Sequence, residues 1–455
     1  MILNDAARGP LVAVHFVLER LEAAQARSAW FDGDAMRTRS TRSHVSRTVA
    51  RLQAPSVAVP TARASRPRRR PVATLGIGDG PAPAARPLYV TRPVLPPLER
   101  LLPLLQEIWD SGVVTNGGPM HERFCAALGT HLGVSPPSLF NNATIALMAA
   151  LRQQQVTGEV ITTPFSFVAT AHAIRWVGAE PVFVDIDPRT LNLDAARIEA
   201  AITPRTSAIV PVHCYGHPCD VEAIEAIARA HGLKVIYDAA HAFGVRHRGR
   251  SLLHWGDLAV LSFHATKVFN TFEGGAVVCR EAGSREALEL VKNFGIVDET
   301  TVSSVGLNGK MSEFNAAVGL LQLETIDADI ACRRAVHQRY SDALADLPGI
   351  TVLDSGNRDG HNFAYCPILV DAPCPLSRDA LYERLKRYGI FTRRYFHPLL
   401  SSLPMYRGLP SAAPEQLPVA HWAAQRVLCL PIFPALDEPS QWRIIQAIRA
   451  EIGAK

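Results

Sequence analysis

The sequence lacks several features that would point away from a globular enzyme. No stretch reaches the roughly 20 uninterrupted apolar residues that a membrane-spanning helix needs, because His15, Glu19 or Arg175 interrupts the longest candidates. It also contains no internal repeat of fixed period. Because 48% of its 455 residues are hydrophobic, the chain can bury a large core. We therefore expect a globular enzyme without a transmembrane segment, and the length favours two or three domains.

CxxC pairs are also missing, although the chain has eight cysteines. Most of them lie in apolar runs, such as VLCLP around Cys429. This usage indicates reduced, mostly buried thiols in a cytoplasmic protein rather than a disulfide framework. We predict no metal site.

Lysine is absent from residues 1–87, which contain fourteen arginines and six acidic residues, a net charge of +8. The rest of the chain carries 33 basic and 36 acidic residues, a net charge of −3. A body with so little charge has no strong attraction for nucleic acid. The basic character of the protein therefore belongs to its first 87 residues.

The composition of residues 1–87 is too polar, and too rich in Arg, Pro and Gly, to offset the entropy cost of ordering them. Only residues 11–24 are apolar enough for a short helix. Acidic residues such as Glu19 and Asp32 stand where an organelle transit peptide avoids them, and the apolar run is short for a secretory signal. A transit peptide or a nucleic-acid arm is the alternative. We expect a disordered extension, or an upstream translation start, before a folded part that begins near Leu88.

From Glu159 onward, short apolar runs rich in β-branched residues alternate with stretches of helical length. Strands without strict polar alternation, separated by helices, indicate a mainly parallel sheet covered on both faces. A long helical stretch over residues 311–344 precedes a smaller α/β unit. We predict an α/β fold with a large domain over residues 88–330 and a small C-terminal domain over residues 331–455.

Two strands lead to residues that could take part in catalysis or ligand binding. The strand before SFHATK delivers Lys267 into a loop, and the strand in LKVIYDAAHA ends at Asp238. Open α/β sheets bind their ligands at the carboxyl ends of their strands. A lone lysine is most often a solvated surface charge, and a lone aspartate most often caps the next helix. Together, the two residues could bind pyridoxal phosphate, with the carboxylate paired to the protonated ring nitrogen.

Two helix beginnings add possible contacts for such a cofactor. In FNNATIALMAAL the helical run starts near Ala143, so its free amides and the Thr144 hydroxyl offer a phosphate site. Phe167 in SFVATAHAI lies just beyond a strand end. It is either a core residue or a flat partner for an aromatic ring.

The order and spacing of these four blocks resemble the DegT/StrS family of pyridoxal phosphate-dependent sugar nucleotide aminotransferases. The resemblance runs from about Leu88 to the C-terminus, about four fifths of the chain. It implies the aspartate aminotransferase-like fold type I, with a mainly parallel seven-stranded sheet and a smaller C-terminal α/β domain. It also implies a homodimer with shared active sites. Residues 1–87 would be an addition to the family pattern.

The resemblance also assigns roles. Lys267 looks like the lysine that binds pyridoxal phosphate covalently and then moves protons. Asp238 resembles the partner of the ring nitrogen, Phe167 the aromatic residue stacked on the ring, and His241 a residue that approaches the ring. Related dehydratases carry histidine in place of this lysine, so Lys267 favours transamination.

Further contacts follow from the same resemblance. The phosphate would be bound by Ala143, Thr144 and Ser262, with Asn308 reaching in from the other subunit. The family often has glycine where this chain has Ala143, and this departure costs little because the contact is a backbone amide. His264 matches a position close to the lysine, although it is also interpretable as a histidine packed under the site.

The segment over residues 386–399 resembles the part of the family that approaches the substrate, so Arg393, Tyr395 and His397 are candidate substrate contacts. The alternative is a plain helix-to-strand connection with surface arginines and packed aromatics. The HATK and FEGGA motifs look more like aminotransferases that act at C4 of dTDP-4-keto-6-deoxyglucose than like those that act at C3. The family resemblance implies glutamate as the amino donor. Transamination at C3, or of a cyclitol ketone, stays open. A non-catalytic pyridoxal phosphate-binding regulatory protein is the alternative from another class.

Overall fold

The computed structural model describes residues 86–354 and 360–453. The predicted basic extension over residues 1–87 therefore lies almost entirely outside the described residues. The described part belongs to one compact unit, and the predicted division near residue 330 stays a prediction. None of the helices in these ranges is both long and apolar enough to cross a membrane.

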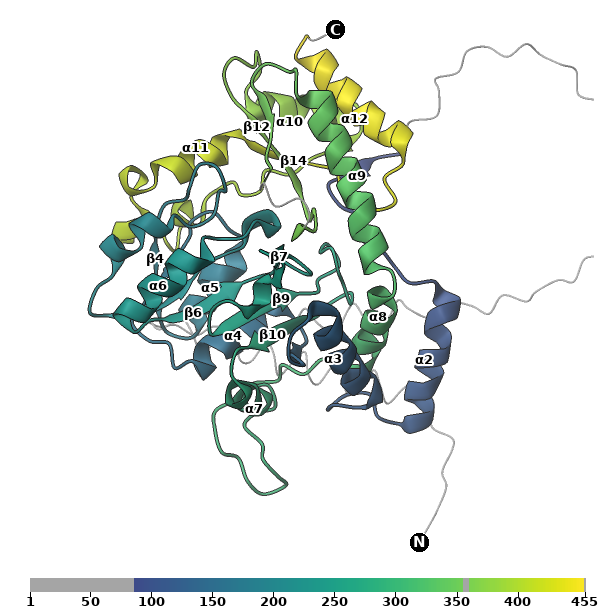
Figure 1. Cartoon of the computed structure of the whole chain (residues 1–455), viewed down its shortest axis with the longest axis vertical. Coiled ribbons are helices and arrows are strands. Elements are labelled where there is room, and N and C mark those ends of the chain that lie inside the picture. The colour runs from purple at the N-terminus through teal and green to yellow at the C-terminus, as the bar shows by residue number, and fades with distance from the viewer. Residues whose placement is uncertain (1–85, 355–359, 454–455) are drawn as a thin grey trace, which may run out of the picture. The chain divides into compact units, whose positions relative to one another are not determined.

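A seven-stranded sheet forms the centre of the fold, in the order β2-β10-β9-β6-β5-β3-β4 (Figure 1). Strands β9, β6, β5, β3 and β4 are parallel, whereas β10 runs antiparallel to both β9 and β2. The predicted mainly parallel seven-stranded sheet is confirmed. The strands are β2 (Ser138–Phe140), β3 (Glu159–Thr162), β4 (Glu180–Phe183), β5 (Thr206–Val210), β6 (Lys234–Asp238), β9 (Leu258–Ser262) and β10 (Gly275–Cys279).

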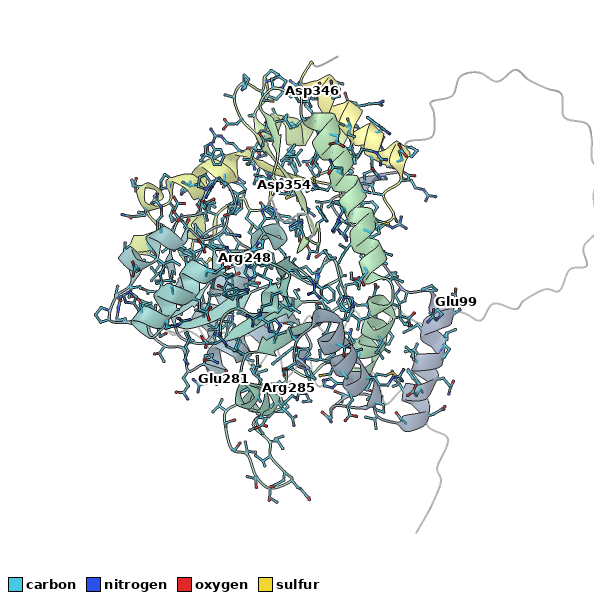
Figure 2. The ribbon with its side chains drawn as sticks, in the orientation of Figure 1. Glu99, Arg248, Glu281, Arg285, Asp346 and Asp354 are labelled. Atoms are coloured by element: carbon cyan, nitrogen blue, oxygen red, sulfur yellow. The ribbon has the colours of Figure 1, made fainter. Side chains whose placement is uncertain are left out.

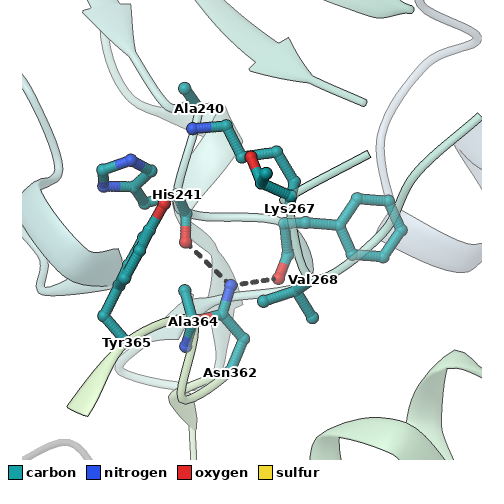
Figure 3. A pocket seen from close by; sticks show the side chains of 9 residues that line it. Ala240, His241, Lys267, Val268, Asn362, Ala364 and Tyr365 are labelled. Carbon is teal, nitrogen blue, oxygen red and sulfur yellow. Dashed lines mark hydrogen bonds between the residues drawn. The ribbon is translucent and has the colours of Figure 1, made fainter. Parts of the chain in front are cut away.

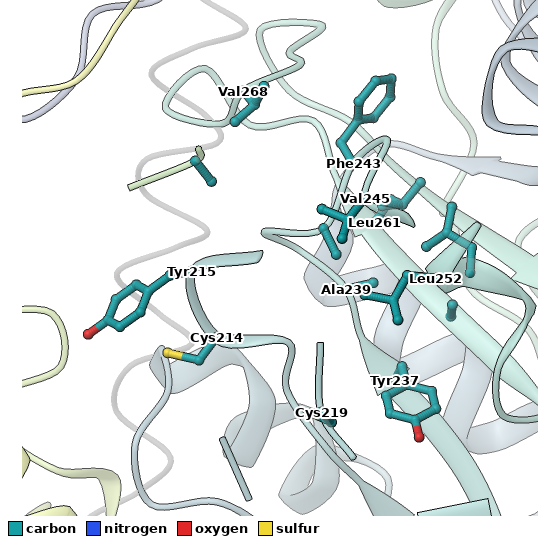
Figure 4. Packing of buried hydrophobic residues seen from close by; sticks show 14 of the residues in the cluster. Cys214, Tyr215, Cys219, Tyr237, Ala239, Phe243, Val245, Leu252, Leu261 and Val268 are labelled. Atoms are coloured by element: carbon teal, nitrogen blue, oxygen red, sulfur yellow. The ribbon is translucent and has the colours of Figure 1, made fainter. Parts of the chain in front are cut away.

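Both faces of this sheet are buried. In β6, Ile236 belongs to one apolar cluster, whereas its neighbours Val235 and Tyr237 belong to another, because successive side chains of a strand point to opposite faces. Figure 4 shows part of the cluster that contains Tyr237. Burial on both faces explains why the strands lack polar alternation. The helices of this part are α2 (Leu98–Ser111), α3 (Pro119–Leu132), α4 (Ala143–Gln153), α5 (Val168–Trp176), α6 (Val221–His231), α7 (Ala282–Val291) and α8 (Glu313–Leu323).

Many charged residues of the helices and their ends lie on the outside, although Glu313, Arg333 and Arg378 are buried. Glu99 on α2, Glu281 before α7 and Asp346 after α9 (Ile326–Leu344) are exposed (Figure 2). The helices thus separate an apolar sheet from solvent, as expected for amphipathic elements.

The C-terminal part has its own apolar cluster around a three-stranded antiparallel sheet in the order β11-β12-β14. Leu88 packs into this cluster, because β1 (Leu88–Tyr89) pairs in parallel with β13 (Ile390–Phe391). The first described strand therefore pairs with the C-terminal part of the chain and not with the seven-stranded sheet. The other elements are β11 (Ile350–Val352), β12 (Cys366–Val370), β14 (Val427–Leu430), α10 (Arg378–Arg387), α11 (Pro418–Arg426) and α12 (Glu438–Glu451), and a small hairpin joins β7 (Arg246–His247) to β8 (Arg250–Ser251).

Candidate active site

A cavity of about 600 Å³ opens at the carboxyl ends of the parallel strands. Two of these strands, β6 and β9, are direct neighbours, which places Asp238 beside Val260 and close to the end of β9 at Ser262. Nine residues predicted from the sequence line this one cavity, and they are Ala143, Thr144, Phe167, Asp238, His241, Ser262, His264, Lys267 and Tyr395.

Lys267 lies in a tight loop after β9. Its backbone amide donates to the His264 carbonyl over 2.9 Å, and the Phe263 amide donates to Gly274 at the start of β10 over 2.9 Å. Burial lowers the pKa of Lys267 from 10.5 to about 8, although Asp238 opposes this shift by favouring the charged form. A lysine with this pKa exchanges a proton readily near neutral pH.

The Asp238 carboxylate lies at the end of β6 and is oriented by two donors. The Thr170 hydroxyl donates to Oδ2 over 2.7 Å, and the Ala240 amide donates to Oδ1 over 3.1 Å. Together the two donors hold the carboxylate in one orientation. Asp238 is therefore suited to pair with a protonated ring nitrogen.

His241 is buried beside Lys267, and both factors lower its pKa well below the usual value. Its Nδ1 accepts a hydrogen bond from the Tyr215 amide over 3.1 Å, so the neutral ring carries its proton on Nε2. The Asn362 side chain donates to the backbone carbonyls of His241 and Phe243 over 2.8 and 2.9 Å (Figure 3). His241 is thus held as a neutral ring.

Helix α4 begins at the cavity with Asn142 as its cap, whose side chain accepts from the Ile145 amide over 2.9 Å. The first amides of a helix have no partner within the helix, so those of Ala143 and Thr144 are available to an anion. Gly275 on β10 permits this placement, because a Cβ there would lie 2.8 Å from the Ala143 nitrogen. The close approach of the α4 N-terminus to β10 therefore requires glycine at position 275.

Phe167 immediately precedes α5, and 58% of its surface is exposed although the side chain lines the cavity. An exposed aromatic ring above a polar site is suited to stacking on a flat ligand. A lysine, a carboxylate, a helix N-terminus and an aromatic face thus share one cavity, and this set fits pyridoxal phosphate.

Three predicted contacts lie outside this lining. Asn308 is exposed, and its side-chain oxygen accepts a hydrogen bond from Lys310 over 2.9 Å. Arg393 and His397 are also exposed, and the backbone of Arg393 pairs with Cys429. Their assigned roles stay predictions. His264 lines the cavity with its Nδ1 2.8 Å from the Thr266 hydroxyl, so it is not an unpartnered packed ring.

Sequence reasoning missed several residues of the cavity and its support. Tyr365 and Phe396 line it, and Tyr215 supports it by donating to the Tyr395 carbonyl. No local pattern marks Tyr215 or Tyr365, whereas Phe396 lies within residues 386–399, the segment already expected to approach the substrate. Thr170 and Ser166 did have a signal, since both stand within the SFVAT motif already examined for Phe167.

The DegT/DnrJ/EryC1/StrS aminotransferase family model matches residues 99–449. The chain belongs to this family. The sequence-based resemblance is therefore confirmed, the chain is an aminotransferase, and pyridoxal phosphate is the cofactor of its family.

Individual relatives agree with this placement. The dTDP-4-amino-4,6-dideoxy-D-glucose transaminase of Shigella dysenteriae is 51% identical over 364 residues, which are 80% of this chain and 99% of that protein. The structure of DesI in the presence of its TDP-sugar product has a TM-score of 0.77 and 40% identity, covering 82% of this chain and 94% of DesI. NtdA from Bacillus subtilis with bound cofactor PMP has a TM-score of 0.72 and 29% identity, covering 78% of this chain and 82% of NtdA.

Proposed function

We propose that this enzyme transfers an amino group from glutamate to C4 of dTDP-4-keto-6-deoxyglucose. The observation that carries the proposal is the 51% identity to a dTDP-4-amino-4,6-dideoxy-D-glucose transaminase over 99% of its length. Lys267 and Asp238 in one cavity support it, because transamination needs an amine and a partner for the cofactor ring.

The residues of the cavity divide the work of binding. The first amides of α4 and the hydroxyls of Thr144 and Ser262 would hold the phosphate, while Phe167 would cover one face of the ring. Asp238 would hold the ring nitrogen through a charge-assisted hydrogen bond. When bound, pyridoxal phosphate supplies a carbonyl that takes up an amino group and a ring that withdraws electrons.

Lys267 would move a proton between the reacting carbon of the substrate and that of the cofactor. Its pKa of about 8 lets the Nζ atom accept a proton and return it near neutral pH. His241 would remain neutral beside it and keep its Nε2 proton available as a hydrogen-bond donor. Tyr395 would contact the sugar nucleotide from the opposite side of the cavity, with Arg393 and His397 nearer its exterior.

We further propose a homodimer in which Asn308 of one subunit reaches the phosphate of the other. Its exposed position outside the lining of its own cavity supports a contact of this kind. We propose the cytoplasm as the location, because all eight cysteines are free thiols and five of them are buried.

The direct test incubates the purified protein, loaded with pyridoxal phosphate, with glutamate and dTDP-4-keto-6-deoxyglucose. We expect 2-oxoglutarate to form and NMR to place the new amine at C4. The corresponding 3-keto sugar and a cyclitol ketone serve as competitors, and kcat/KM should be about a hundredfold lower for both. An equal or higher value for either competitor would reject the proposed substrate.

A further inference from the structure

Two buried hydroxyl groups lie directly behind Asp238. The Thr170 hydroxyl is 2.7 Å from Asp238 Oδ2, and the Ser166 hydroxyl is 2.9 Å from that of Thr170. Thr170 is fully buried and Ser166 is 4% exposed, so neither exchanges its partner freely with water. Thr170 does not line the cavity and cannot touch a bound ligand there. Thr170 contacts two residues that do line it, Ser166 and Asp238, and Asp238 is the one proposed to hold the cofactor ring.

The direction of these hydrogen bonds follows from the number of protons. An ionised carboxylate only accepts, so Thr170 must donate its single hydroxyl proton to Asp238. The remaining bond then requires Ser166 to donate to the Thr170 oxygen. The three groups form one directed chain from Ser166 through Thr170 to Asp238, and we name it the hydroxyl chain.

The position of the hydroxyl chain adds to its effect on charge. Thr170 lies in the first turn of α5, where its amide donates to the Phe167 carbonyl over 3.2 Å. The positive end of the helix dipole therefore faces the carboxylate, as does the positive end of the Thr170 hydroxyl. The titratable groups that face Asp238 from the other elements are Lys267 after β9, Cys214 after β5 and His241, which is neutral.

We propose that Thr170, supported by Ser166, is a positioning residue that fixes the orientation of the Asp238 carboxylate during transamination. This inference rests on the proposed function, in which Asp238 holds the ring nitrogen. A donor on Oδ2 stops the carboxylate from rotating and disperses its negative charge. The hydroxyl chain thereby sets the electrostatic potential in which Lys267 and the cofactor exchange protons.

Two substitutions at one position separate this role from packing. Thr170→Val keeps the shape and removes the hydroxyl, whereas Thr170→Ser keeps the hydroxyl and removes the methyl group. We expect Thr170→Val to lower kcat about tenfold with an unchanged KM for the keto sugar, and Thr170→Ser to stay within about twofold of wild type. If Thr170→Ser loses as much activity as Thr170→Val, the position acts through packing and the proposal is wrong.

A spectroscopic readout tests the same point without turnover. The visible absorption of the lysine-bound cofactor is titrated with pH in each variant. Removing the positive end of the hydroxyl dipole makes the electrostatic potential of the site more negative, which favours the protonated, cationic form of the lysine-bound cofactor. Thr170→Val should therefore raise the midpoint of this titration by about 0.5 to 1 pH unit. Ser166→Ala should move it in the same direction by a smaller amount. An unmoved midpoint in both variants would overturn the proposal.

A double-mutant cycle tests whether Thr170 acts through Asp238. In the Asp238→Asn background, Thr170→Val should change kcat by less than about twofold, because the neutral Asn side chain carries no negative charge for the Thr170 hydroxyl to stabilise. A persisting tenfold loss would contradict the hydroxyl chain. Failure of the proposed function looks different: wild-type protein would then show no lysine-bound absorption and no transamination, and the role of Thr170 would fall with it.

Discussion

The two sides of the active-site cavity are built in different ways. On one side, Asp238 and Ser262 end neighbouring parallel strands, and helices begin at Ala143 and directly after Phe167. On the other side, Tyr365 and Tyr395 lie in irregular segments of the C-terminal part. Sheet register fixes the first set, whereas contacts between distant segments fix the second. We name these the strand-end side and the loop side.

The difference teaches where chemistry and specificity reside. Strand ends and helix starts are rigid, and a shift of one residue would move a side chain to the other face of the sheet. The loop side is held by single contacts, such as the hydrogen bond from Tyr215 to the Tyr395 carbonyl. We therefore expect substitutions on the strand-end side to change kcat and those on the loop side to change KM.

The largest effect is expected at Lys267. In the proposed mechanism the Lys267 amine binds the cofactor and moves the proton, so Lys267→Ala should lower kcat on the order of a thousandfold or more. The exposed Lys234 at the start of β6 is the matched control, and Lys234→Ala should retain full activity. Steady-state rates and borohydride trapping of the cofactor are measured for both variants. Retained turnover in Lys267→Ala would reject its assignment.

The next effect is expected at Asp238. Asp238→Asn removes the charge proposed to pair with the ring nitrogen and should lower kcat about a hundredfold, since hydrogen bonds to charged groups are the strong ones. Thermal unfolding should change little, because the amide fills the same space. Asp220 caps α6 through the Ala223 amide, and Asp220→Asn is the control that should leave kcat intact. Comparable losses in both variants would contradict a specific role.

On the loop side, Tyr395→Ala should raise KM for the keto sugar about tenfold with a smaller change in kcat, because it removes a large apolar contact. The exposed Arg393 and His397 are tested in parallel, and their alanine variants should stay within about threefold of wild type. Initial-rate kinetics at varied sugar concentration distinguish the cases. A larger KM effect at Arg393 or His397 would place the substrate farther out than the cavity lining indicates.

The smallest effect is expected at Phe167. Phe167→Ala removes a stacking face and should weaken cofactor retention about fivefold. Trp176, at the other end of the same helix and 75% exposed, supplies the control, and Trp176→Ala should retain the cofactor as wild type does. Equilibrium dialysis of the cofactor compares them. Equal retention in the two variants would argue that Phe167 does not cover the ring.

The strand-end side could be predicted from the sequence because its signals are local. An apolar run that ends at Asp238, or one that passes through Ser262 toward Lys267, marks the carboxyl end of a buried strand. Parallel strands bring such ends to one edge, and the cavity there unites nine of the predicted residues. Gly275 shows the limit of prediction from local sequence. Glycine is required there because β10 passes close to Ala143, and this contact is known only once β10 and α4 are placed together.

The sequence by itself determined the family, the mainly parallel sheet and the strands that lead to Lys267 and Asp238, because residue type and hydrophobic pattern act over short distances. Only the tertiary structure decided that β1 packs with the C-terminal part and that Tyr365 joins the cavity. It alone placed Thr170 behind Asp238, 68 residues away along the chain. Such contacts depend on how separate elements pack, and packing leaves no periodic trace in the sequence.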